Sequence, residues 1–94
     1  MAYVVLYHPA VQREDIPRIA PDQRSRVARA VEARLTTEPQ RYGEPLRQTL
    51  KGYWKLRVGD YRVVFRVMGE AVWIYAITHR REVYRRVRPR LSGA

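Results

Sequence analysis

From Tyr53 to Val67 the chain reads Tyr-Trp-Lys-Leu-Arg-Val-Gly-Asp-Tyr-Arg-Val-Val-Phe-Arg-Val, and this stretch decides its fold. Two runs of alternating side chains flank Gly59-Asp60, and a glycine at the first central position of a two-residue loop is typical of a type II′ turn. The stretch therefore predicts a β-hairpin. Successive side chains of a strand point to opposite faces, so one face of the hairpin is apolar. It carries Trp54, Leu56, Val58, Tyr61, Val63, Phe65 and Val67.

The other face of the hairpin is basic, with Tyr53, Lys55, Arg57, Arg62, Val64 and Arg66. A two-residue loop sets Val58 opposite Tyr61, and therefore Arg57 opposite Arg62. Directly opposed like charges destabilise a strand pair. A protein that binds phosphate gains from such a pair, so this face predicts an anion-binding surface.

Composition points the same way. The 94 residues predict a single domain, 1–94. With 19 basic and 9 acidic residues the net charge is +10, which indicates an anionic partner: nucleic acid, a membrane surface or an acidic protein. The absence of cysteine excludes disulfides and thiolate chemistry. The longest apolar run, residues 71–77, is far shorter than the ~20 residues of a membrane helix, so we expect a cytoplasmic protein with no membrane partner.

Upstream of the hairpin the sequence predicts one strand, two helices and a loop. The strand is Tyr3 to Tyr7. His8-Pro9 opens a helix that is expected to end or kink near Ile16, because Pro17 lacks an N–H and clashes with the preceding turn. A second helix begins at Pro21. Residues 38–52, rich in proline and glycine, are expected to form a loop. The apolar stripe of the second helix is Val27, Ala28, Val31 and Leu35.

Downstream, a tight turn at Gly69-Glu70 leads to a near-continuous apolar strand from Ala71 to Thr78. A short helix follows from Arg80 to Arg88 and ends at Pro89, with Val83 and Val87 on one face. This order predicts an α+β fold: a small, antiparallel-rich twisted sheet made of the N-terminal strand and a three-stranded meander, with helices packed on one face.

The third strand adds aromatic side chains to the basic face. If Gly69-Glu70 is a two-residue loop, Trp73, Tyr75 and Ile77 share the face of Arg62. Cations that follow phosphates and rings that stack on bases together favour a single RNA strand as ligand. The alternative is that Trp73 and Tyr75 are core residues beneath a covering helix.

Two segments resemble the signature of the RelE/ParE toxin superfamily: residues 50–65, and His79-Arg80-Arg81-Glu82-Val83-Tyr84. The resemblance extends from Tyr3 to Val87 and is closer to RelE than to ParE. It implies a RelE-like fold with two N-terminal helices and a short C-terminal helix. It also implies the toxin of a type II toxin–antitoxin system, which enters the ribosome, cleaves mRNA without a metal, and is neutralised by a cognate antitoxin.

The resemblance assigns catalysis to Lys55, Arg62, Tyr84 and Arg80, with Arg81 as the alternative arginine. The planar guanidinium of Arg62 suits a bidentate hold on phosphate, and the Lys55 ammonium suits neutralisation of developing charge. Tyr84 suits base stacking or proton transfer, and Arg80 suits a neighbouring phosphate. Further RNA contacts are expected from Lys51, Tyr53, Arg57, Arg66 and Arg81. The family has a lysine near the position that Tyr53 holds in this chain. Lys51 would take the place of that lysine.

Two other functions remain open: a ParE-like inhibitor of DNA gyrase, and a toxin-derived binding module that has lost activity. His79 is a candidate general base, but a lone histidine at a strand end more often has a structural role, and His8 is expected to cap a helix. No histidines and acids stand at metal-ligand spacing, so we expect no metal and no cofactor.

Overall fold

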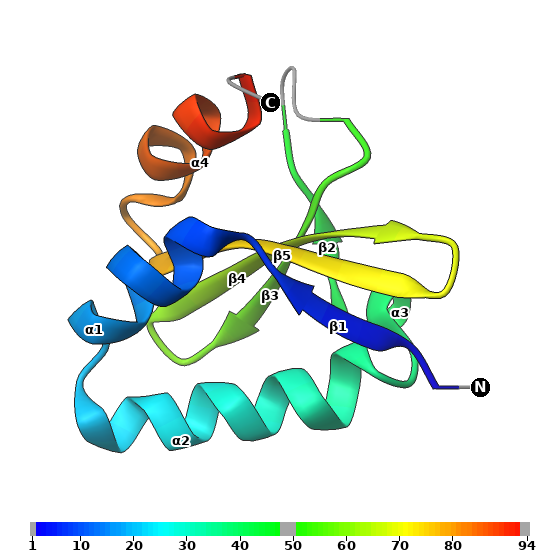
Figure 1. The fold of residues 1–94 in the computed structure, drawn as a ribbon, viewed down its shortest axis with the longest axis horizontal. Coiled ribbons are helices and arrows are strands. Elements are labelled where there is room, and N and C mark those ends of the chain that lie inside the picture. The colour runs from blue at the N-terminus through cyan, green and yellow to red at the C-terminus, as the bar shows by residue number, and fades with distance from the viewer. Residues whose placement is uncertain (1, 48–50, 93–94) are drawn as a thin grey trace.

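A computed structural model describes residues 2–47 and 51–92. Five strands form one sheet in the order β1-β5-β4-β3-β2 (Figure 1). Only β1 and β5 run parallel, which confirms the antiparallel-rich α+β fold. The strands are β1 (Val4–Tyr7), β2 (Glu44–Pro45), β3 (Trp54–Val58), β4 (Tyr61–Met68) and β5 (Ala71–His79).

The hairpin of β3 and β4 has the predicted register. Val58 lies opposite Tyr61 and Arg57 lies opposite Arg62. Gly59 has a φ of +59°, a left-handed conformation that glycine adopts without the strain a side chain would bring. The second turn is also as predicted, since Met68 pairs with Ala71 across Gly69-Glu70.

A β-bulge between β4 and β5 changes which residues share a face. Val64 pairs with Ala76 but Phe65 pairs with Ile74, so Tyr75 has no partner on β4. One extra residue reverses the alternation beyond it. Tyr75 therefore lies on the basic face, where its ring meets that of Tyr53 at 5.4 Å. The prediction for Ile77 is wrong, because the bulge turns it into the opposite, apolar core.

The first face of the sheet is covered by the N-terminal helices. These are η1 (Val11–Asp15, a π-helical segment), α1 (Ile16–Arg18), α2 (Pro21–Ala30) and η2 (Val31–Leu35, also π-helical). Figure 1 shows α2 lying along one side of the sheet. The buried stripe that α2 and η2 share is Val27, Val31 and Leu35, whereas Ala28 is exposed, contrary to prediction.

The first helix ends near Ile16, as predicted, but after Pro17 rather than before it. The helical backbone continues through Pro17 to Arg18. Pro17 falls in the first turn of α1, where a missing N–H costs little. The π-helical segment before it makes this possible, because it restarts the α-helical hydrogen bonding just ahead of the proline.

The second face is covered by α4 (Val83–Ser92), so the prediction that helices pack on one face alone is wrong (Figure 1). The helix begins three residues later than Arg80 and continues past Pro89. Leu91, beyond the proline, packs against the same core, which favours the longer helix. The second core consists of Leu46, Val64, Ala76, Val83 and Val87, with Tyr53, Tyr84 and Leu91 at its margin.

The predicted loop at 38–52 is partly structured. It contains α3 (Pro39–Tyr42) and β2, which pairs Glu44 with Lys55 and Pro45 with Trp54. Residues 48–50 and 93–94 lie outside the described part of the chain. In the part that is described, no helix combines the length and the apolarity needed to cross a membrane.

Candidate functional site

The cationic side chains of β3 and β4 surround the second core. We call Lys55, Arg57, Arg62 and Arg66 the basic face; all four lie on the side of the sheet that α4 covers in part. Lys55 stands between Glu44 on β2 and Val64 on β4 and is half-buried. Arg57 and Arg66 are exposed. Because Arg57 faces Arg62, Lys55 and Arg62 are diagonal neighbours on the same surface.

Arg62 is the buried member of the basic face, with 8% of its surface exposed. Its Nη1 donates to the carbonyl oxygens of Gly59 and Tyr61, both at 2.9 Å. Burial, and after it the charges of Arg57 and Arg80, lower the pKa of Arg62. Within the described residues its Nε and Nη2 donors have no partner. The side chain is thus held in place with donors left for an anion.

Arg80 lies beside Arg62, at the end of β5. Its backbone N–H donates to the carbonyl of Asp60 at 2.8 Å, and its Nε lies 3.9 Å from the Asp60 carboxylate. Half of its side chain remains exposed. Arg81 is exposed as well. Of the two arginines, Arg80 is the one whose backbone and side chain contact Asp60, in the turn beside Arg62.

Tyr84, in the first turn of α4, is half-buried at the margin of the second core. Its Oη accepts a hydrogen bond from the backbone N–H of Arg47 at 3.1 Å. The position of the ring therefore depends on where α4 lies on the sheet and on the segment after β2.

Tyr53 takes part in an aromatic cluster at the edge of the basic face. Its ring packs edge-on against Tyr75, and the Arg66 guanidinium lies 5.3 Å from its centre. The Arg66 Nη1 donates to the Tyr53 hydroxyl at 3.4 Å. Lys51 is exposed in the turn that leads into β3. These residues extend the basic face with rings and cations.

The two histidines have local structural contacts. The Nδ1 of His79 accepts the backbone N–H of Arg81 at 3.3 Å, and its residue pairs with Tyr61, away from Arg62. The Nδ1 of His8 accepts the N–H of Ala10 at 3.1 Å, which confirms the predicted cap. Across residues 2–47 and 51–92, no three histidine, aspartate or glutamate side chains are grouped so that they could hold a metal ion.

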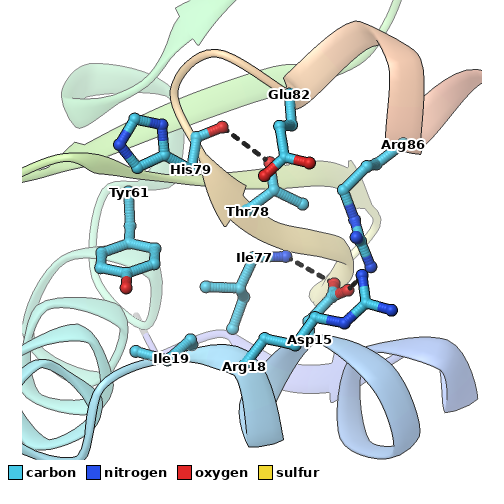
Figure 2. A pocket seen from close by; sticks show the side chains of 9 residues that line it. All are labelled: Asp15, Arg18, Ile19, Tyr61, Ile77, Thr78, His79, Glu82 and Arg86. Atoms are coloured by element: carbon cyan, nitrogen blue, oxygen red, sulfur yellow. Dashed lines mark hydrogen bonds and ion pairs between the residues drawn. The ribbon is translucent and has the colours of Figure 1, made fainter.

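A second polar site, which no sequence pattern indicated, lies near the same C-terminal end of β5. A pocket of about 240 Å³ there is lined by none of the predicted catalytic or RNA-binding residues, although His79, the candidate general base, is part of its wall (Figure 2). At its base Asp15 is 2% exposed and contacts Arg86 and Arg90. Asp15 lies in the polar run Gln12-Arg13-Glu14-Asp15, where no local signal separates it from exposed neighbours.

We expect the Arg57–Arg62 pair to reduce stability. Arg57→Gln should raise the free energy of unfolding by roughly 0.5 kcal/mol, since it removes one of two directly opposed like charges. Urea unfolding of the purified protein measures this. The matched control is Arg66→Gln, because Arg66 pairs with Trp73 and its loss should not stabilise the fold. A less stable Arg57→Gln variant would show that the pair is not repulsive.

Comparison with known proteins identifies several relatives. Residues 5–84 match the family model described as ParE toxin of type II toxin-antitoxin system, parDE. The chain is 34% identical to toxin RelG of Mycobacterium tuberculosis over 88 residues, which is 92% of this chain and 100% of that protein.

Solved structures are similar too. In the toxin–antitoxin complex RelBE2 of M. tuberculosis, one chain matches with a TM-score of 0.77 and 31% identity, over 84% of this chain and 92% of that one. Free E. coli toxin RelE, in a mutant form, matches with a TM-score of 0.65 and 21% identity over 97% and 99% of the two chains, which bears on the fold alone.

Proposed function

Because this chain belongs to the ParE toxin family and is the toxin of a type II toxin–antitoxin system, we propose that it stops translation by cleaving mRNA on the ribosome. The observation that carries the proposal is the environment of Arg62, which is buried and still has donors without a partner among the described residues. A buried guanidinium with free donors, beside two other cations, is unfavourable for the fold alone. It is suited to an anion that arrives from outside.

The proposed reaction is attack of an RNA 2′-hydroxyl on the adjacent phosphorus, with cleavage of the bond to the 5′ oxygen of the next nucleotide. The proton leaves the 2′ oxygen and one is delivered to the 5′ oxygen. Negative charge grows on the phosphate oxygens, where the donors of Arg62 can bind. Lys55, its diagonal neighbour, would neutralise the leaving oxygen, and Arg80 would hold an adjacent phosphate.

Tyr84 has the remaining role, either stacking on a base or transferring a proton. Positioning and electrostatics can supply much of the rate of such a reaction without a metal. The exposed side chains of Arg57, Arg66, Lys51 and Arg81 would bind flanking phosphates, and the ring of Tyr53 would support them.

The proposed partners follow from this reaction and from the family. The first two are the ribosome and mRNA, and for a protein that acts on them we expect a cytoplasmic location. A cognate antitoxin is the third partner, supported by the similarity to a chain of the RelBE2 toxin–antitoxin complex.

A ParE-like inhibitor of DNA gyrase is the second candidate, favoured by the family model that the chain matches. Two assays run in parallel with the purified protein separate the candidates: synthesis of a reporter in a reconstituted translation reaction, and DNA supercoiling by gyrase. We expect translation to stop while supercoiling continues. The reverse result would identify a gyrase inhibitor, and no effect in either assay would indicate an inactive binding module.

A further inference from the structure

Asp15 forms a buried charge cluster with two arginines of α4. The side chain of Asp15 has no exposed surface, and those of Arg86 and Arg90 are 16% and 9% exposed. Arg90 binds both carboxylate oxygens, with Nη1–Oδ2 and Nη2–Oδ1 distances of 2.7 Å. Arg86 adds Nη2–Oδ1 at 3.2 Å (Figure 2). The cluster joins two helices that are about 70 residues apart in the sequence, as the 15-to-86 and 15-to-90 contacts show.

The same cluster binds the backbone of β5 at the bulge. The pairing of β1 with β5 ends at Ile74, the partner of Tyr7. Just beyond it, Asp15 Oδ2 accepts the N–H of Ile77 at 2.9 Å, and Arg90 Nη1 donates to the carbonyl of Tyr75 at 2.9 Å. The side chains of Asp15 and Arg90 thus supply hydrogen bonds to the backbone of β5 beyond the end of its pairing with β1.

This arrangement is better suited to fixing geometry than to stabilising the fold. Among the residues that the structure describes, the buried Nε of Arg86 has no hydrogen-bond partner. A buried ion pair often stabilises a protein no more than apolar packing does, and a missing hydrogen bond adds a cost. The cluster instead restricts geometry. A bidentate pair holds the Arg90 side chain in one orientation, and this favours one position of α4.

We propose that Asp15 is a positioning residue, which holds α4 on the sheet through Arg90 and Arg86 and so places Tyr84 for the reaction. This inference rests on the proposed function. Tyr84 is in the same helix, two residues ahead of Arg86 and six ahead of Arg90, and packs on the margin of the second core. A shift of α4 would displace its ring from the basic face.

The test uses Arg90→Gln and Asp15→Asn in the full chain, with Arg85→Gln as the matched control. Arg85 is in the same helix, 77% exposed, and paired with Glu82 rather than Asp15. Well below the melting temperature, we expect Arg90→Gln to lower kcat on the order of 10- to 100-fold, because small misplacements of reacting groups have effects of that size. KM should stay within about twofold, since the basic face is intact. Arg90→Lys, which keeps the charge, should recover part of kcat.

Hydrogen exchange gives a readout that does not depend on activity. In Arg90→Gln the amides of α4 should exchange faster while those of β4 stay protected; in Arg85→Gln neither should change. If Asp15→Asn fails to fold, the Arg90 variants carry the test alone.

A double-mutant cycle with Tyr84→Ala separates positioning from general loosening. If Arg90 acts through Tyr84, Arg90→Gln has no further effect on kcat in the Tyr84→Ala background. Additive losses, or an Arg90→Gln variant with wild-type kcat, would overturn the inference. The cycle can also be scored on growth inhibition in cells. A wild-type protein that arrests growth without cutting mRNA would refute the proposed function, and the cycle would still decide whether Asp15 positions α4.

Discussion

Arg62→Gln is expected to reduce mRNA cleavage by at least ~100-fold, the usual cost of removing one preorganised donor to a developing negative charge. Stability should change by less than about 1 kcal/mol, which is unusual for a buried residue. Two effects oppose each other. The variant loses hydrogen bonds to the carbonyls of Gly59 and Tyr61, but it also removes a cation whose pKa is lowered by burial, Arg57 and Arg80.

Cleavage rates and urea unfolding of the same preparations measure both quantities. The matched control is Arg29→Gln, an exposed arginine of α2 on the other side of the sheet, which should alter neither. Full cleavage by Arg62→Gln would remove Arg62 from the site. Wild-type stability combined with lost cleavage would support a residue retained for function.

Tyr84→Ala is the second large effect that we expect, again a loss of at least ~100-fold in cleavage. It removes the ring that would stack on a base and the hydroxyl that would move a proton. Tyr84→Phe separates these roles. It keeps the ring and loses the hydroxyl, together with the hydrogen bond from the N–H of Arg47. Activity near wild type in Tyr84→Phe identifies stacking; loss equal to that of alanine identifies proton transfer.

Circular dichroism and thermal unfolding show whether these variants remain folded. Tyr42→Ala is the control, since Tyr42 is 47% exposed on α3 and away from the basic face. A folded Tyr84→Ala variant that still cleaves mRNA at the wild-type rate would exclude Tyr84 from the reaction.

The hairpin could be predicted because its information is local. Alternation in residues 53–67 and a glycine-led turn specify both the pairing and the faces, and the opposed arginines follow from them. Gly69-Glu70 extended the sheet to β5 in the same way. The bulge at Tyr75 has no such signal, and it alone put Ile77 on the other face.

Tertiary contacts explain the other differences. Pro17 and Pro89 read locally as helix ends, yet a π-helical segment accommodates the first and packing of Leu91 accompanies the second. Asp15 is a polar residue like its exposed neighbours in the sequence. It is buried only because α4 brings two arginines to it. Sequence patterns such as hydrophobic periodicity report local structure. Contacts between residues about 70 positions apart leave no such pattern in a single sequence.

Primer extension on mRNA from a reconstituted translation reaction tests the central claim most directly. We predict a new 5′ end within the coding region when wild-type protein and ribosomes are both present, and none with Arg62→Gln or with naked mRNA. Intact mRNA beside wild-type protein, in a reaction where translation has nonetheless stopped or gyrase is inhibited, would contradict the account.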